Sequence, residues 1–303
     1  MTLRTPNPTI NQGLLLDVQR NKERIAVLQE QIATGKRIIR PGDDPTGSAM
    51  ILDFQVSIDR NTAYLRQADS ALSFLGTAET ATQSLSDSIM RLFEIGIQAL
   101  TSPVNANSRA ASAQEVDGLR STIISVGNTQ DQGRYIFSGT STLTAPFTGP
   151  SAGPIAYGGN PGLINLDVSP SYTVTTNVPG STLFFGPGGQ GSSSDLFQAV
   201  TDLRDGLAGN NTAQIQTAYN NLQTIFNRVV QTTGDLGGRQ AALLNLKDTL
   251  DTANIGLESL VNTTGQVDYA AAATDFNTAQ TIQQATLSTL AKVNQKSLFD
   301  YLG

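Results

Sequence analysis

Apolar residues recur at heptad spacing along two long stretches of the chain. Between residues 211 and 262 an apolar residue occupies every seventh position, and most residues three places further on are apolar too. The first series is Ile215, Leu222, Val229, Leu236, Leu243, Leu250 and Leu257. This a/d pattern predicts a long helix that packs lengthwise against other helices. Glycines at 234, 237 and 238 predict a local break in that helix.

The first half of the chain carries the same pattern in two further helices. Asp44 before Pro45 predicts a helix start, with Asp44 as the N-cap and Pro45 at the first helical position. Apolar a/d positions then run from Ile51 to Leu92, with a polar stretch near 80–84. A third helix is predicted around 116–126. Helices of this length are too long for a compact globule, so we expect a mainly α fold built as an elongated bundle.

Both ends of the chain carry an amphipathic stripe. We expect an assembly interface on these stripes, formed by Leu14, Val18, Ile25, Leu28, Ile32, Phe276, Ile282, Leu290, Val293, Leu298, Phe299 and Tyr301. Such stripes dock either on the chain's own core or on neighbouring copies, and a heptad seam serves both equally well. The pattern leaves these two alternatives open.

Composition changes between residues 138 and 194. This stretch holds 11 of the 28 glycines, 7 of the 12 prolines and a single charged residue, Asp167. The runs 163–168 and 172–175 have strand composition, and 183–185 reads as a weak strand. We therefore expect a small β-rich domain inserted between the helices. The predicted division is 1–42 (assembly helix and turn), 43–137 (rod helices), 138–194 (β insert), 195–264 (rod helices) and 265–303 (assembly helix).

The residue types argue against catalysis and against metal, cofactor or nucleic-acid binding. The chain has no Cys, His or Trp, and its net charge is −6, which disfavours thiol, His-based and nucleic-acid functions. The G-x-G-x-x-G match at 186–191 lacks a surrounding βαβ unit, so we interpret it as a loop. Asp43 and Asp44 are interpreted as helix caps and not as a metal or acid–base pair. We expect no catalytic residue, cofactor, metal, membrane insertion or cleaved signal.

Four runs resemble one known family. They are 28–45 (LQEQIATGKRIIRPGDDP), 133–140 (GRYIFSGT), 268–270 (DYA) and 297–302 (SLFDYL). These runs are similar to the flagellin superfamily and, within it, to the branch that joins the flagellar hook to the filament. The resemblance covers about residues 10–140 and 195–303. Pro45 stands where flagellins usually carry Ala, and the insert has no family signature.

The resemblance implies a structural, non-enzymatic role at the hook–filament junction, outside the cell, where the protein templates flagellin polymerisation. The implied partners are other copies of the chain, the first hook-associated protein, flagellin, the flagellar type III export apparatus and an export chaperone. The implied role of the terminal helices is to order as subunits assemble, so that burial offsets the entropy of fixing them.

Three other functions remain open on the sequence. A divergent flagellin that forms the filament itself belongs to the same class. An enzyme housed in the β insert is a second alternative, against which stands the single charged residue, Asp167. A coiled-coil adhesin or phage-tail fibre is the third, and it would make the runs at 133–140 and 297–302 coincidental.

Overall fold

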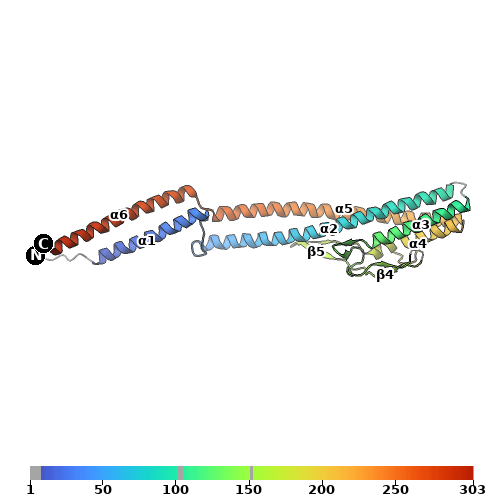
Figure 1. Ribbon diagram of the computed structural model, residues 1–303, viewed down its shortest axis with the longest axis horizontal. Helices are drawn as coiled ribbons and strands as arrows, with labels where there is room; N and C mark the ends of the chain where they lie inside the picture. Colours follow the sequence, from blue (N-terminus) through green and yellow to red (C-terminus); the bar gives the residue numbers. More distant parts are fainter. Residues whose placement is uncertain (1–7, 102–104, 151–152, 303) are drawn as a thin grey trace. The chain divides into compact units, whose positions relative to one another are not determined.

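Six helices dominate the fold (Figure 1). The computed structural model describes residues 8–101, 105–150 and 153–302, with the main chain alone described for 8–11 and 293–302. The helices are α1 (Pro8–Thr34), α2 (Pro45–Thr101), α3 (Ala106–Gly127), α4 (Leu196–Ala208), α5 (Thr212–Gly265) and α6 (Tyr269–Leu302). The predicted mainly α fold with a small β insert is confirmed.

The chain forms two compact units. We name residues 1–60 and 252–303 the terminal unit, and residues 61–251 the central unit. Because α2 and α5 are long, each contributes residues to both units. The five-part division expected from composition stays a prediction.

The terminal unit is built on an antiparallel pair, α1 and α6, which lie side by side (Figure 1). The Asn21 amide of α1 donates to the Ala279 carbonyl of α6 at 2.8 Å. Arg24 and Asp275 form an exposed ion pair at 3.7 Å, which contributes little to stability. The pairing is therefore held mainly by the apolar seam between the two helices.

Two aspartates shape the turn between α1 and α2. Asp44 Oδ1 accepts from the Gly47 N–H at 2.9 Å, as an N-cap does, and α2 begins at Pro45 as predicted. Asp43 Oδ2 accepts from the Ile39 and Arg40 N–H groups at 3.1 and 2.8 Å. Asp44 is thus the predicted cap of α2, whereas Asp43 closes the turn before the helix and caps no helix end.

The heptad seam forms the helical core of the central unit. Six of the predicted α5 positions are buried, namely Ile215, Leu222, Val229, Leu236, Leu243 and Leu250. The predicted break at Gly234, Gly237 and Gly238 is wrong, because α5 runs unbroken through them. Leu236 and Leu243 are fully buried, and such packing offsets the cost of glycine in a helix, about 1 kcal/mol per residue.

The described residues after α3 form three two-stranded antiparallel sheets, of which the first precedes residue 138 and the other two lie in the insert. The strands are β1 (Gln130–Asp131), β2 (Arg134–Tyr135), β3 (Phe147–Thr148), β4 (Ala156–Tyr157), β5 (Asn165–Ser169) and β6 (Tyr172–Thr175). The β5–β6 hairpin confirms the two predicted strand runs. The strand predicted at 183–185 is wrong, since 181–185 form a π-helical turn, η1 (Ser181–Phe185). Leu183, Phe184 and Phe185 are all buried, whereas successive strand residues would point to opposite faces.

An aromatic cluster forms the core of the insert. The ring centroid of Phe147 lies 4.6 Å from that of Phe184 and 5.2 Å from that of Phe197, which belongs to α4. Phe184 and Phe197 stack with an interplanar angle of 6°. Buried aromatic pairs of this kind contribute about 0.5–1.5 kcal/mol beyond their area. The insert is therefore an ordered module packed on the helices.

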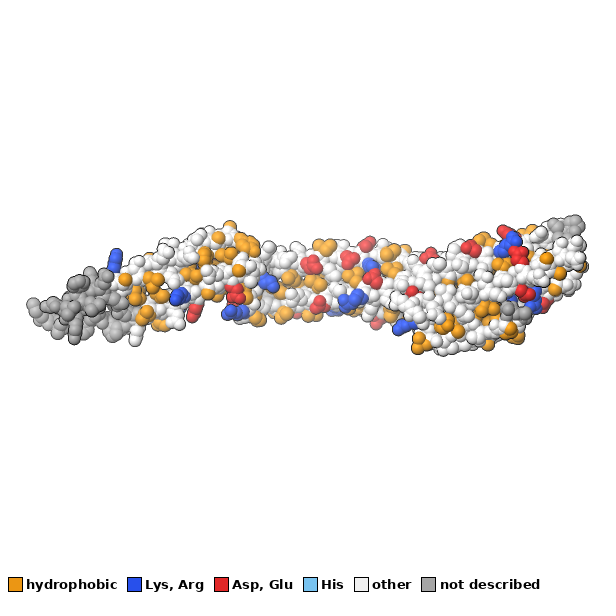
Figure 2. Space-filling view, in the orientation of Figure 1, with side chains coloured by type: hydrophobic (Ala, Val, Ile, Leu, Met, Phe, Trp, Pro, Cys, Tyr) orange, Lys and Arg blue, Asp and Glu red, His pale blue; other side chains and the backbone are white. Residues whose placement is uncertain are grey.

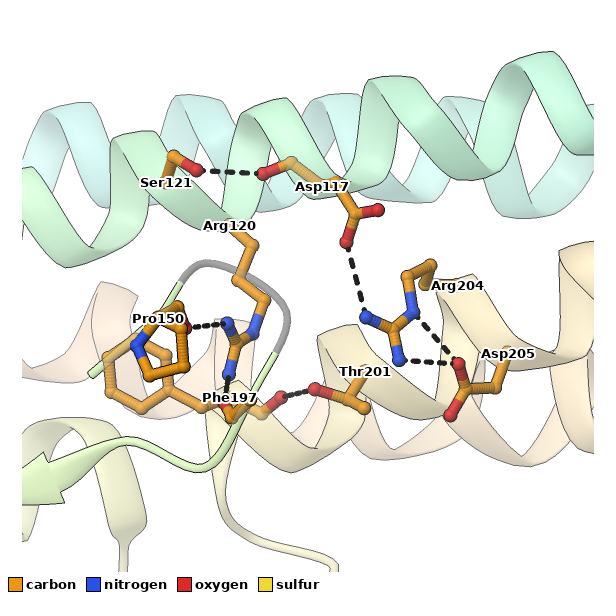
Figure 3. Close-up of polar contacts among 9 residues, drawn as sticks. Asp117, Arg120, Ser121, Pro150, Phe197, Thr201, Arg204 and Asp205 are labelled. Carbon is orange, nitrogen blue, oxygen red and sulfur yellow. Dashed lines mark hydrogen bonds and ion pairs between the residues drawn. The ribbon is translucent and has the colours of Figure 1, made fainter.

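Three arginines from the helices fasten the insert by its main chain. Arg120 of α3 and Arg228 and Arg239 of α5 donate to backbone carbonyls. Their acceptors include Pro150 at 3.2 Å, Leu183 at 3.0 Å, Ser194 at 2.7 Å and Thr175 at 2.8 Å. Figure 3 shows Arg120 reaching from α3 to Pro150. Charged donors make these hydrogen bonds stronger than neutral ones.

Candidate assembly interface

The predicted N-terminal stripe faces α6. Asn21 occupies a d position of that stripe, and its amide contacts the Ala279 carbonyl. Leu28 is buried, and the rest of the predicted set is half-buried: Leu14, Val18, Ile25 and Ile32. The structure thus brings these residues together along one side of α1, against the other end of the chain.

The predicted C-terminal stripe is only partly brought to the same seam. Phe276 and Leu290 are half-buried, and Ala272 and Ala279 are buried beside α1. Ile282 is 48% exposed and lies off this seam. The side chains of the other predicted residues lie outside the described residues: Val293, Leu298, Phe299 and Tyr301. The described parts of the two stripes therefore pack on each other within one chain, and the expected assembly interface stays a prediction.

The terminal unit also carries exposed apolar side chains. Leu15, Leu16 and Val27 of α1 are 56%, 55% and 41% exposed. Others lie on α2, α5 and α6: Met50, Leu52, Val56, Ile255, Leu260, Tyr269, Ile282 and Leu287. Figure 2 shows apolar side chains gathered over this part of the molecule. Exposed apolar side chains that gather in a patch are typical of interaction sites, which makes this set a candidate.

Sequence reasoning named only Ile282 from this exposed set. The signal was present, because Leu15 and Leu16 follow Leu14 directly and widen the apolar stripe beyond one face. A helix that is apolar on several faces needs more than one packing partner. A search for apolar residues outside the a/d positions would have found this surface.

A main-chain ladder ties the end of α1 to the start of α6. The Arg37 N–H donates to the Gly265 carbonyl at 2.7 Å, and the Val267 N–H donates to the Gly35 carbonyl at 3.0 Å. The Arg37 guanidinium also bonds Asp44 at 3.0 Å and the Thr264 carbonyl at 2.9 Å. The Gly47 N–H first, and Arg37 second, hold the pKa of Asp44 below its ordinary value. This ladder fixes where the α1–α6 pair begins.

Gly35 is required at this ladder by its conformation. Its φ is 72°, in the left-handed region, and a Cβ placed there would lie 2.6 Å from the Tyr269 hydroxyl. Beside it lies a cavity of about 390 Å³ with a mixed lining that includes Lys36, Ile51 and Val261. The lining brings together no set of groups suited to acid–base or nucleophilic work.

The central unit holds a second cavity, of about 320 Å³, beside the buried side chains of Arg120 and Asp195. Asp195 caps α4 and accepts from the Gly191 and Phe197 N–H groups at 2.7 and 2.9 Å. Burial raises the pKa of this carboxyl group. Because Asp195 and Arg120 bond to the main chain, both charged groups serve structural roles.

Neighbouring polar groups are paired with one another. Arg204 of α4 bonds Asp117 of α3 at 3.4 Å and Asp205 at 2.6 Å (Figure 3). Within the described residues, no three acidic residues are grouped so that they could hold a metal ion. The helices of the same residues include none with an apolar stretch able to cross a membrane.

Comparison with known families identifies the class. The family model of the bacterial flagellin N-terminal helical region matches residues 9–142, and that of the C-terminal helical region matches residues 219–302. Together the two regions span more than half of the chain, at both ends. The chain belongs to the flagellin family.

Similar proteins place it nearer the hook-associated members than the flagellins. Flagellar hook-associated protein 3 of Salmonella typhimurium is 24% identical, covering 90% of this chain and 91% of the relative. Its Escherichia coli counterpart is 25% identical, covering 89% and 90%. Flagellins match at lower identity. The Legionella pneumophila flagellar junction protein shares the fold, with a TM-score of 0.57, 17% identity and coverage of 73% of this chain and all of that one.

These similarities confirm the expected class of function. The protein is a structural component of the flagellum, of the hook-associated type, and its family is not one of enzymes. The resemblance of residues 28–45, 133–140 and 297–302 to the flagellin superfamily is likewise confirmed. The runs at 133–140 and 297–302 are thus no coincidence, as a phage-tail or adhesin function would have required.

Proposed function

We propose that this protein joins the flagellar hook to the filament and presents a surface on which flagellin polymerises. The observation that carries the proposal is the exposed apolar surface of the terminal unit, which the α1–α6 pairing leaves uncovered. Neighbouring copies would bury it by packing their own terminal helices against it. The predicted interface set contributes indirectly, since its α1 members hold the pair together.

The energetics favour assembly as the way to complete this burial. Covering the exposed half of a leucine such as Leu15 or Leu16 contributes about 1 kcal/mol. The exposed set has eleven members, so each subunit gains several kcal/mol against the cost of association. A subunit that exposes this surface is under pressure to leave solution and join an assembly.

The partners of the proposed role follow from it. The hook side would contact the first hook-associated protein, and the filament side would contact flagellin. Delivery would use the flagellar type III export apparatus and a chaperone that covers the apolar ends before export. The working location is outside the cell, and a chain without cysteine suits it.

Gene deletion tests the role against its alternative. Electron microscopy of the cells should show hooks without filaments, and immunoblots should find flagellin shed into the medium. Hooks without filaments and no flagellin anywhere would instead make this chain the filament subunit. That alternative is kept because flagellins also match along the chain. Normal filaments would reject both.

A matched pair of variants tests the surface itself. Leu16→Asp places a charge on the exposed apolar face, and Gln29→Asp places the same charge at an exposed polar position of the same helix. We expect Leu16→Asp to abolish filaments while the purified chain keeps its helical content. Gln29→Asp should leave filaments normal. Filaments in the Leu16→Asp strain would show that this face is not an assembly surface.

A further inference from the structure

Three glycines of α5 are not explained by the conformation of the central unit. Gly234, Gly237 and Gly238 lie outside the left-handed φ region, and a Cβ built on each meets no atom within 4 Å. Neither backbone geometry nor packing therefore requires glycine there. Each glycine nevertheless lowers local helix formation roughly fivefold relative to alanine. The three glycines thus lower the helix propensity of one stretch of α5, and no contact in this conformation requires them.

The facing stretch of α2 is weakened as well. Gln240 of α5 donates to Glu79 of α2 at 2.7 Å, and Lys247 pairs with Asp69, so the antiparallel register sets 234–238 opposite about 80–85. Along α2, hydroxyl groups bond back to the carbonyl four residues earlier, at Thr77, Thr80, Ser84 and Ser88. Such bonds compete with the helical ladder and favour bending.

A groove beside α2 leaves space into which this helix can move. An open groove of about 440 Å³ runs beside α2, lined by small side chains that include Ser73, Thr77 and Thr80 and, from α3 and the segment after it, by Val126 and Thr129. The Cβ position of Gly76 meets no atom within 4 Å either. Apart from Leu72 and Val126 the lining consists of Ser, Thr, Gly and Ala, which leaves room for a small displacement of α2.

We propose that residues 76–88 of α2 and 234–238 of α5 form a bend point at which both helices flex together. Arg239 follows the glycines directly and holds the Thr175 carbonyl at the end of the β5–β6 hairpin. A bend at this level would therefore move the hairpin with the helix. Such flexibility would suit a subunit placed between the hook and the filament, which are tubes of different structure. This consequence rests on the proposed function.

Distance measurement on the full chain in solution tests the bend point. The chain has no cysteine, so Gln223→Cys and Asn245→Cys label two exposed α5 positions on either side of the glycines. A straight helix would separate the two Cα atoms by about 33 Å. Electron–electron double resonance between nitroxide labels on the two cysteines should give a broad distribution of distances that extends below this value. Adding Gly234→Ala, Gly237→Ala and Gly238→Ala should narrow it.

Gly118→Ala with Gly256→Ala is the matched control, because these are helical glycines with open Cβ positions away from the bend point. The control should leave the distribution broad. A distribution already narrow in the parent chain, or narrowed equally by the control, would overturn the proposal. All variants should fold, since alanine favours the helix, and circular dichroism checks this. The measurement needs no flagellum, so its failure is distinct from that of the proposed function.

Discussion

The terminal and central units use the same heptad pattern to different ends. In the central unit the seam of α2 and α5 is joined by α3, α4 and the insert, and residues such as Leu85, Leu222 and Phe184 are fully buried. Among the described side chains of the terminal unit, the buried apolar ones are Leu28, Val267, Ala272 and Ala279. The pattern predicts that a seam forms, and the number of elements that converge on it decides whether the core is complete.

The largest expected effect breaks the core of the central unit. Phe147→Ala removes a ring that contacts the rings of Phe184 and Phe197, so we expect a loss of about 3–5 kcal/mol in unfolding free energy. Urea unfolding followed by circular dichroism measures it. Leu143→Ala, at a side chain 84% exposed in the same insert, should change stability by less than about 0.5 kcal/mol. Equal effects of the two variants would mean that the aromatic cluster is not a core.

The next effect sharpens the contrast between the two seams. Leu236→Ala, at a fully buried position of α5, should cost about 2–5 kcal/mol. Leu28→Ala, in the thinner α1–α6 seam, should cost about half as much, because fewer neighbours surround the cavity. Hydrogen exchange resolved by segment assigns each loss to its unit. A larger loss for Leu28→Ala would show that the terminal unit has the more complete core.

A smaller effect concerns the ladder that begins the α1–α6 pair. Gly35→Ala forces a side chain into the left-handed region and against the Tyr269 hydroxyl, at a cost of about 1–2 kcal/mol. Tyr269→Phe removes that hydroxyl and should recover part of the loss in the double variant. Hydrogen exchange of the 35–37 and 265–267 amides reports it. No recovery would assign the whole cost to backbone strain.

The smallest expected effects are changes of the unfolding free energy with pH, which have opposite signs for an aspartate in each unit. The pKa of Asp44 is lowered when folded, so its contribution is present above the unfolded pKa, near 3.8, and is lost as pH falls. The pKa of Asp195 is raised when folded, chiefly by burial, so its contribution is greatest below the unfolded value and declines as pH rises through the folded pKa. Asp195→Asn keeps an N-cap acceptor and should abolish that decline in urea titrations between pH 4 and 7. The same decline in the variant would exclude Asp195 as its source.

Much of the fold follows from the sequence alone. The a/d series predicts α2, α3 and α5, Asp44 and Pro45 place the start of α2, and strand composition places the β5–β6 hairpin. Two errors have a common physical origin. Local propensity predicts a break at the three glycines of α5 and a strand at 183–185, but burial of Leu236 and of the Phe184 ring overrides it.

The proposed assembly surface was harder to predict for a different reason. The heptad pattern identifies residues that face a partner helix, and in α1 that partner is α6 of the same chain. Residues that face another copy follow no period that the chain's own helices impose. Leu16 and Val27 are apolar residues outside the a/d positions, and a search restricted to the heptad pattern passes over them.

The way in which the insert is fastened bears on how such a protein diversifies. Arg120, Arg228 and Arg239 hold carbonyl oxygens, which every residue type supplies, and Asp167 is the single charged residue between 138 and 194. Substitutions of the insert's outward side chains therefore leave the carbonyl acceptors of the three arginines in place. Substitutions on the exposed side of the insert can therefore accumulate without weakening its attachment to the helices.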